Sequence, residues 1–392
     1  MIDVAVIGAG AAGIAAALHL QAAGLRVQVL EARRRVGGRA VTDHSLGVPA
    51  DLGAAWLHFA TDNPFTTLAR QQGLQVLEQD PGWGSALLAA YFAAADAAGA
   101  AGLDVPVSSV IPDDEHRARF DAVMSWAVGM PSEAVSTLDL HRYDESEHNW
   151  MVVEGLGTVV AAAAATLPIT LNAQVTHIDW RGPGVRIEGS HGLLQARAVI
   201  VTLPTAVLAG SDSPRFTPAL PATHRQAIHD LPLGVCNKVF LRFDEADLPP
   251  GRQHSIGETH TSRTASWSLR PAGQPLALAY FGGPLSQELE AAGELVAFAR
   301  EQLAQVFGSA LAQRVRGTLA TAWGSDPWAQ GSYSAARPGA ADARAILASP
   351  VAPQLLLAGE ACSINRYGTL PGAWESGLRA AQTVLRTLGD TP

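Results

Sequence analysis

The sequence has little cysteine. Cys236 and Cys362 are its only two, they lie far apart, and no Cys-x-x-Cys or His-Glu-x-x-His pattern occurs. This usage excludes a disulfide framework and gives no support for a metal site. We expect both cysteines to be small buried side chains in a protein that works in a reducing compartment.

Long apolar runs and a leader segment are also missing. The alanine-rich stretch 89–101 contains Tyr91 and Asp96 and falls short of a membrane span. The chain opens directly on a strand pattern, without a basic segment or cleavage site, and closes on the polar residues 388–392. The sequence therefore predicts a cytoplasmic protein without a membrane partner.

Basic residues are outnumbered by acidic ones, 27 against 36, which gives a net charge of -9. The excess argues against nucleic acid as a partner and slightly favours a cationic ligand, although solubility explains the same charge. Asp144, Glu145 and Glu147 could attract a polycation at the mouth of a cleft. A solvated acidic loop is the simpler account of these three residues.

The first forty residues carry a dinucleotide-binding pattern. An apolar strand at 3–7 leads into Gly8, Gly10 and Gly13 and then into a helix-favouring stretch at 11–23. The first glycine allows a tight turn, the second lets backbone approach a pyrophosphate, and the third lets the helix pack on the strand. The helix N-terminus then presents unpaired N–H groups to the phosphates.

The residues after the second predicted strand favour FAD over NAD. Glu31 ends that strand, where its carboxylate can accept hydrogen bonds from both ribose hydroxyls and would repel the 2′-phosphate of NADP. Gly37, Gly38 and Arg39 follow shortly. A longer dinucleotide needs a second close approach of backbone, and an arginine can neutralise its pyrophosphate.

At this point the sequence resembles the flavin-containing amine oxidases, which include monoamine oxidases, polyamine oxidases and flavin-type histone demethylases. The similar blocks occur in order at 31–39, 51–58 with Asn63-Pro64, 237–243, 323–334, 358–361 and 368–373. The most specific is Trp323-Gly-Ser-Asp-Pro-Trp-Ala-Gln-Gly-Ser-Tyr333-Ser, which is closest to the spermine oxidases and the demethylases. In its motifs as a whole the chain is most similar to the polyamine and spermine oxidases.

The glycine motif and the resemblance together give the expected cofactor-binding residues: Gly8, Gly10, Ala12, Gly13, Glu31, Ala32, Arg33, Gly38, Arg39, Gly53, Ala54, Ala55, Trp56, Val175, Trp323, Gly359, Glu360, Thr369, Leu370 and Ala373. Among them, Glu360 is expected to hydrogen-bond ribityl hydroxyls or to lie near the pyrophosphate. A helix from about Gly372 is expected to direct its N-terminal dipole at the flavin N1 and C2 oxygen.

The resemblance also implies catalytic roles. Tyr333 would form one wall of an amine cage, with Thr369 opposite it in place of the second tyrosine of monoamine oxidases. Lys238 would hold a water against flavin N5. His58 resembles a polyamine oxidase active-site position, although a structural histidine explains it equally well. Ser332 stands where covalent members have a cysteine, so the FAD should be bound noncovalently.

The implied reaction is oxidation of a polyamine or another primary or secondary amine by hydride transfer to flavin N5. The resulting imine would be hydrolysed to an aldehyde and an amine, and O2 would be reduced to H2O2. Three alternatives stay open: an amine dehydrogenase with another electron acceptor, an FAD-dependent desaturase of an apolar substrate, and a flavin-bearing binding protein with little turnover. The oligomeric state is left open.

A chain of 392 residues, 48% of them hydrophobic, is too long for one simple core and favours two domains. We predict an α/β fold: a Rossmann-like FAD-binding domain of parallel sheet and helices, interleaved with an α+β substrate-binding domain. The first would comprise 1–60, 151–230 and 326–392, and the second 61–150 and 231–325. Expected strands include 169–179, 184–188, 196–203, 233–243 and 354–358, and an amphipathic helix is expected at 288–307.

Overall fold

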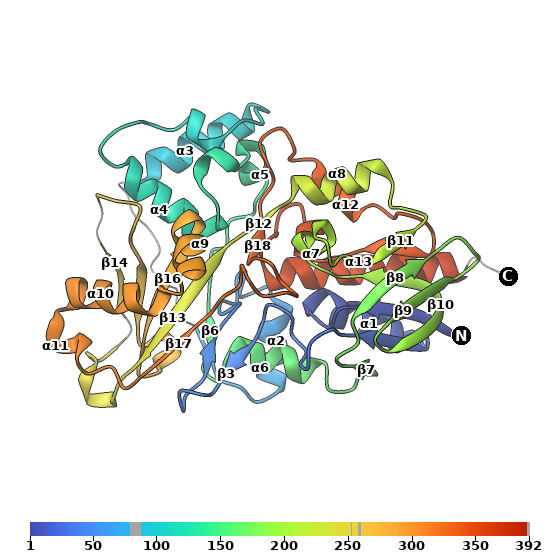
Figure 1. Cartoon of the computed structure of the whole chain (residues 1–392), viewed down its shortest axis with the longest axis horizontal. Coiled ribbons are helices and arrows are strands. Elements are labelled where there is room, and N and C mark those ends of the chain that lie inside the picture. Colours follow the sequence, from blue (N-terminus) through green and yellow to red (C-terminus); the bar gives the residue numbers. More distant parts are fainter. Residues whose placement is uncertain (79–87, 252, 258–259, 390–392) are drawn as a thin grey trace.

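The computed structural model describes residues 1–78, 88–251, 253–257 and 260–389 (Figure 1). Part of the predicted segment 61–150 and the last three residues of the predicted polar C-terminus lie outside the described residues. In the described part, every helix is too short or too polar to cross a membrane.

The predicted nucleotide-binding unit at the N-terminus forms as a strand, a helix and a parallel strand. These are β1 (Ile2–Ile7), α1 (Ala11–Ala22) and β2 (Val27–Leu30), with Val4 opposite Val27 in parallel register. The apolar residues 4–7 of β1 are buried, and Gly24 adopts a φ of +83° just after the helix. The pattern read from these thirty residues is therefore confirmed.

An eight-stranded sheet is built around this unit. Its order is β11-β8-β9-β10-β1-β2-β7, and β19 pairs with the C-terminal part of β10. The pairs that involve β1, β2, β7 and β19 are parallel, whereas β8, β9 and β10 form an antiparallel run. The added strands are β7 (Ile169–Thr170), β8 (Val175–Asp179), β9 (Val185–Gly189), β10 (Gly192–Val201), β11 (Arg215–Thr217) and β19 (Leu355–Leu357).

Helices cover both faces of this sheet. One face packs on α1, α2 (Pro64–Gln71), α6 (Leu156–Ala163) and the long α13 (Leu370–Gly389). The other face packs on α8 (Ala222–Asp230) and α12 (Ala343–Ala348), and α7 (Thr205–Ala209) lies beside α8. Figure 1 shows α13 lying alongside α1. A Cβ at Gly377 would lie 2.1 Å from the Ala12 carbonyl oxygen, so this close approach requires glycine.

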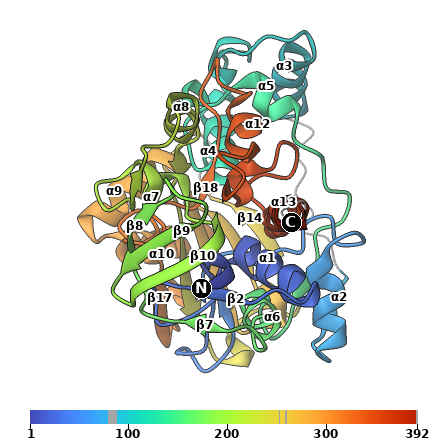
Figure 2. The same cartoon turned by 90° about the vertical axis from the view of Figure 1, so that its right-hand side faces the viewer.

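A second, antiparallel sheet lies at the other end of the molecule (Figures 1 and 2). Its order is β14-β15-β16-β13-β17, formed by Gln253–Ile256, Ser266–Leu269, Leu276–Gly282, Cys236–Arg242 and Gly317–Ala320. One face packs on α9 (Gly283–Ala292), α10 (Leu295–Phe307) and α11 (Ser309–Ala312) through a core that includes Trp267 and Phe281. The two sheets with their helices confirm the predicted α/β class, whereas the domain boundaries stay a prediction.

Three predicted elements are divided in the structure. The strand expected at 169–179 is two strands, because β7 pairs with β2 while β8 pairs with β9. The strand expected at 233–243 is two strands, because β12 (Leu233–Gly234) pairs with β18 (Tyr333–Ser334) while β13 belongs to the five-stranded sheet. The helix expected at 288–307 is also divided, because Gly293 adopts a φ of +70° and ends α9 before α10 begins.

The remaining elements are short or lie outside the two large sheets. The helices are α3 (Ala89–Ala100), α4 (Arg117–Val128) and α5 (Thr137–His141). Two small strand pairs join β3 (Thr42–Asp43) to β4 (Ala50–Asp51) and β5 (Val76–Leu77) to β6 (Met151–Val152). Single 3₁₀ turns occur at Val107–Ser109, Ser132–Ala134, Glu245–Asp247, Pro271–Gly273 and Glu360–Cys362.

Candidate active site

A cavity of about 770 Å³ is lined by residues of both large sheets. It brings together every residue predicted to bind the cofactor or to take part in catalysis, except Gly13. These are Gly8, Gly10, Ala12, Glu31, Ala32, Arg33, Gly38, Arg39, Gly53, Ala54, Ala55, Trp56, His58, Val175, Lys238, Trp323, Tyr333, Gly359, Glu360, Thr369, Leu370 and Ala373. Their individual roles stay predictions.

The glycines at the start of α1 are present for different structural reasons. Gly8 has a φ of +103°, and a Cβ at Gly13 would lie 1.9 Å from the Gly8 carbonyl oxygen. Both positions therefore need glycine for the protein's own geometry. A Cβ at Gly10 would meet only the Cα of Gly38, at an ordinary 4.0 Å. The protein's own packing therefore does not require glycine at this position, and the predicted close approach of a pyrophosphate to the Gly10 backbone stays the explanation for it.

Glu31 is buried at the end of β2, and backbone N–H groups hold its carboxylate. Oε2 accepts a hydrogen bond from Ala9 at 2.8 Å, and Oε1 accepts one from Arg33, also at 2.8 Å. Each carboxylate oxygen can accept two hydrogen bonds, so one position on each is left for ribose hydroxyls. This geometry fits a dinucleotide.

The guanidinium of Arg33 is already paired with a residue that sequence reasoning missed. It binds the Asp326 carboxylate through two hydrogen bonds of 2.8 and 2.6 Å. Burial alone would raise the pKa of Asp326, but the Arg33 guanidinium holds it below its ordinary value. Arg33 thus ties the ribose end of the cavity to the segment that carries Tyr333.

Arg39 and Glu360 form an ion pair of 3.1 Å beside the cavity. Glu360 Oε1 also accepts from the Ser334 N–H, and Oε2 accepts from the Ser334 hydroxyl at 2.7 Å and from the Gly368 N–H at 2.9 Å. These four bonds use all the acceptor positions of the carboxylate. The expected hydrogen bonds from ribityl hydroxyls to Glu360 are therefore not supported, and its partner is Arg39.

Lys238 extends from β13 to the turn after β4. Its Nζ donates to the carbonyl oxygens of Asp51 at 2.8 Å and Gly53 at 2.6 Å. Burial lowers the pKa of this ammonium to about 8, with Asp51 and Cys236 opposing the change. Lys238 is the only lysine in the chain, so every other permanent side-chain cation is an arginine. That composition is a signal that sequence reasoning overlooked.

Tyr333 reaches the cavity from β18 with its hydroxyl engaged. The hydroxyl donates to the Trp126 carbonyl oxygen at 2.5 Å and lies 2.7 Å from the hydroxyl of Tyr280. Burial raises the pKa of both phenols well above the ordinary value. Tyr280 is the direct cross-strand partner of Lys238, and sequence reasoning missed it because only the register of β13 and β16 reveals the pairing.

Thr369 caps the helix α13. Its hydroxyl accepts from the Gly372 N–H at 3.1 Å and donates to the Arg366 carbonyl at 2.6 Å. The helix consequently begins at Leu370, two residues before the predicted start at Gly372. Its first turn borders the cavity through Leu370 and Ala373, as the dipole argument requires.

His58 also lines the cavity, and the side-chain amide of Asn149 fixes its ring. The Asn149 amide nitrogen donates to the Ser146 carbonyl, so its oxygen faces His58 Nδ1 at 2.5 Å. This contact assigns the proton to Nδ1 and leaves Nε2 as a hydrogen-bond acceptor. Burial lowers the pKa of His58, which favours the neutral ring. Of the acidic residues 144, 145 and 147, only Glu145 lines the cavity.

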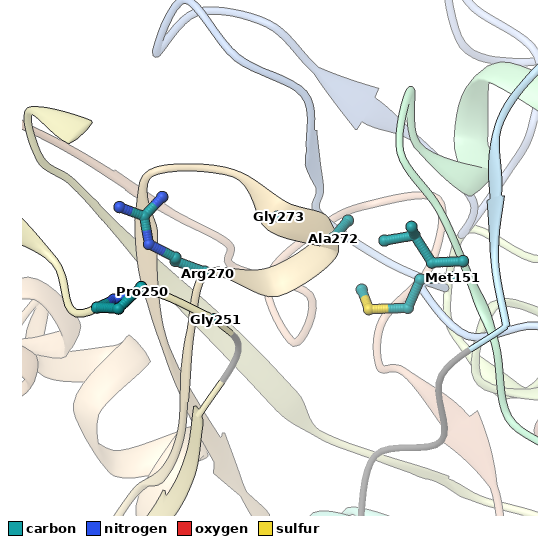
Figure 3. Close-up of a pocket in the computed structure, with 7 residues that line it drawn as sticks. Met151, Pro250, Gly251, Arg270, Ala272 and Gly273 are labelled. Atoms are coloured by element: carbon teal, nitrogen blue, oxygen red, sulfur yellow. The ribbon is translucent and has the colours of Figure 1, made fainter.

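A second cavity of about 460 Å³ lies near the strand pair β5–β6 (Figure 3). It is lined by Leu77, Met151, Pro250, Gly251, Arg270, Ala272 and Gly273, none of which is a predicted site residue. The Arg270 guanidinium is engaged by the Pro249 and Glu245 carbonyl oxygens and by the Glu245 carboxylate, at 2.6–2.8 Å. The charge of this arginine is therefore satisfied by the neighbouring segment 245–249.

The fold and the main cavity together define a flavin-dependent oxidoreductase. The cavity joins a dinucleotide motif, with the buried carboxylate of Glu31 and the guanidinium of Arg39, to a buried lysine with two tyrosines.

Comparison with known proteins identifies the family. The family model described as flavin containing amine oxidoreductase matches residues 11–92 and 102–385, and the chain belongs to this family. Its cofactor is FAD, which the glycine cradle and Glu31 fit. The chain is 32% identical over 432 residues to polyamine oxidase 4 of Oryza sativa, with 97% of this chain and 88% of that protein covered.

Two further proteins extend the comparison. Polyamine oxidase 2 of Arabidopsis thaliana is 31% identical, with 97% of this chain and 87% of that protein covered. Among solved structures, cyclohexylamine oxidase from Brevibacterium oxydans has a TM-score of 0.81 and 22% identity, and the match covers 99% of both chains. At that identity the likeness is one of fold. The sequence-based assignment to the amine oxidase family is confirmed.

Proposed function

We propose that the protein oxidises a polyamine or another primary or secondary amine at the carbon next to nitrogen. The imine product is hydrolysed to an aldehyde and an amine, and O2 accepts the electrons to give H2O2. The observation that carries the proposal is the chain's single lysine, buried in the same cavity as the dinucleotide motif and held by two backbone carbonyls. The polyamine oxidases among its relatives support the substrate class.

Bound FAD supplies the acceptor for a hydride equivalent, at its N5 atom. The residues of the chain have to present the amine in its neutral form, because a protonated nitrogen has no lone pair to donate to the forming imine. A cavity wall of Tyr333 and Tyr280, both un-ionised at neutral pH, excludes water without adding a charge. His58 is neutral as well, and its Nε2 can accept a hydrogen bond from a substrate N–H.

Lys238 is suited to hold a water molecule and to exchange a proton with it. Two of its donor positions are used by the Asp51 and Gly53 carbonyls. The third position is an N–H when the side chain is charged and a lone pair when it is neutral. With a pKa of about 8, both forms are present near neutral pH. An arginine could not lose a proton in this way.

The FAD is proposed to be bound noncovalently. At the position of the covalent linkage in some relatives, Ser332 donates through its hydroxyl to the Cys236 carbonyl and accepts from the Cys236 N–H, both at 2.9 Å. The two cysteines of the chain are free and buried, which supports a cytoplasmic location.

The experiment that tests the proposal uses the purified yellow protein and a panel of amines. Anaerobic mixing with spermine, spermidine, a diamine and a cyclic monoamine should bleach the flavin with at least one of them. Admitting oxygen should then restore the colour and release H2O2. Bleaching followed by slow reoxidation identifies an amine dehydrogenase. If no amine bleaches the flavin, amine oxidation is refuted and the desaturase alternative is tested next.

The Lys238→Met variant separates the proposed role of the lysine from cofactor binding. We expect it to retain FAD and to be reduced by the amine, but to reoxidise or turn over more slowly. Unchanged kinetics in both half-reactions would contradict the role assigned to Lys238.

A further inference from the structure

Arg344 and Asp139 form an ion pair in the interior of the protein, outside the residues predicted to act. Arg344 lies on α12 and is 0% exposed, and Asp139 lies on α5 and is 1% exposed. The guanidinium binds the carboxylate through hydrogen bonds of 2.6 and 2.9 Å. Two charges removed from water in this way are expensive unless further hydrogen bonds satisfy them.

The remaining donors of Arg344 point toward the cofactor side of the protein. Its Nη1 donates to the Ser334 hydroxyl at 2.9 Å, and its Nη2 donates to the Ser334 carbonyl oxygen at 3.2 Å. The Ser334 hydroxyl in turn donates to Glu360 Oε2 at 2.7 Å. The ring of Tyr367 lies 3.5 Å from the guanidinium carbon. The Ser334 hydroxyl thus bridges the ion pair and the carboxylate of Glu360.

Glu360 connects the Asp139–Arg344 pair to Arg39 through a hydrogen bond. One guanidinium nitrogen of Arg39, Nη1, is held by Glu360 at 3.1 Å and by the Ser332 carbonyl oxygen at 2.7 Å. Within the described part of the chain, Nε and Nη2 of Arg39 have no protein partner, and the residue lines the FAD cavity. Their N–H groups are therefore left to bind an anion of the cofactor.

We propose that the Asp139–Arg344 pair is a positioning device for FAD: it keeps Glu360 ionised, and ionised Glu360 holds Arg39 with its free N–H groups toward the cofactor pyrophosphate. The charges alternate along the path from Asp139 through Arg344 and Glu360 to Arg39. This inference concerns cofactor binding and does not depend on which amine is oxidised.

The electrostatics around Glu360 agree with this arrangement. Burial by itself would raise the pKa of Glu360, and the cations Arg39 and Arg344 hold it below the ordinary value. The other titratable neighbours are Tyr367 and Cys362, and burial raises the pKa of both so that neither is ionised at neutral pH. Without Arg344, protonation of Glu360 would replace an acceptor by a donor and release Arg39.

The test compares FAD dissociation from the holoenzyme of wild type and of the neutral double variant D139N/R344Q. The double variant avoids leaving one buried charge unpaired. Free FAD is measured by its fluorescence after dilution, at pH 6 and at pH 8. At each pH the dissociation constant of the variant is divided by that of wild type, so that the titration of Lys238, which both proteins share, cancels. In D139N/R344Q the constant should rise by about tenfold or more at pH 6, the loss expected for a charge-assisted hydrogen bond, and by less at pH 8.

Two further variants keep the test decisive. The control R117Q/D121N removes a partly buried ion pair that does not line the cavity, and it should leave FAD dissociation unchanged. S334A removes only the hydroxyl between Arg344 and Glu360, so it should fold even if the double variant does not, and it should weaken FAD binding more at pH 6 than at pH 8. A folded S334A or D139N/R344Q that binds FAD like wild type at both pH values overturns the proposal.

A third variant identifies the titrating group. Adding E360Q to D139N/R344Q should make the ratio to wild type the same at pH 6 and pH 8, because the carboxyl of Glu360 is then no longer there to be protonated. If the ratio to wild type still differs between pH 6 and pH 8 in the triple variant, another group causes the pH dependence and the role of Glu360 is refuted.

Discussion

The buried ammonium of Lys238 should make the stability of the apoprotein depend on pH in a way that the Lys238→Met variant lacks. In the unfolded chain this lysine has its ordinary pKa of 10.5, whereas burial lowers it to about 8 in the folded protein. Between those values the unfolded state binds more protons than the folded state. Wild type should therefore gain stability as the pH rises from 8 to 10.5, and lose that stability as the pH falls back to 8.

The size of the effect follows from the same two values. One pKa unit corresponds to about 1.36 kcal/mol, so the charged form of Lys238 costs the fold about 3 kcal/mol below pH 8. Between pH 7 and pH 10 the difference in unfolding free energy between wild type and K238M should change by about 2.5 kcal/mol, in favour of K238M at the lower pH. The variant also leaves the Asp51 and Gly53 carbonyls without a donor, but that loss does not vary with pH.

Urea unfolding of both proteins from pH 7 to pH 10 measures this difference, and groups common to both proteins cancel. Because Lys238 is the only lysine, selective isotope labelling of lysine gives a single NMR signal for its Cε, whose titration reads the pKa directly. We expect a midpoint near 8. A midpoint above 10, or a stability difference that stays constant from pH 7 to pH 10, would refute the reasoning.

Three other predictions follow from close contacts. G10A should leave the urea midpoint of the apoprotein unchanged but weaken FAD binding by about tenfold or more. G13A should instead lower the unfolding free energy by more than about 2 kcal/mol, because its Cβ would lie 1.9 Å from a backbone oxygen. Asn149 fixes the ring of His58, so N149A should raise the KM of the amine and leave FAD dissociation unchanged. An unaltered KM would contradict the role proposed for His58. G377A should lower the thermal midpoint by at least about 2 °C, since its Cβ would lie 2.1 Å from the backbone of α1, and an equal midpoint refutes that contact.

The sequence predicted best what is local. The unit β1–α1–β2 is encoded by alternation, by glycine and by apolar runs within thirty residues, so its form and the place of Glu31 could be read directly. The division of the expected helix 288–307 was also visible in principle, since Gly293 lies within it. The division of 233–243 was not, because it depends on β12 pairing with β18, about one hundred residues away.

Long-range contacts account for what the sequence did not predict at the site. Tyr280 enters the cavity because β16 pairs with β13 in a register that places it opposite Lys238. Asp326 meets Arg33 across 293 residues, and Asp139 meets Arg344 across 205. No local pattern specifies such pairs. They arise only when the interleaved segments of the chain assemble into one fold, which fixes the distances between them.

Two of the cations that line the cavity, Arg39 and Lys238, differ in the property that their proposed roles require. The cofactor pyrophosphate is a permanent anion, and Arg39, the residue proposed to face it, presents several N–H groups in one plane. The role proposed for Lys238 requires a group that can gain and lose a proton, and this single lysine is buried in the cavity and held by two carbonyls. Arginine is used everywhere else in the sequence. A lysine at this one position agrees with the proposed need for a dissociable proton there.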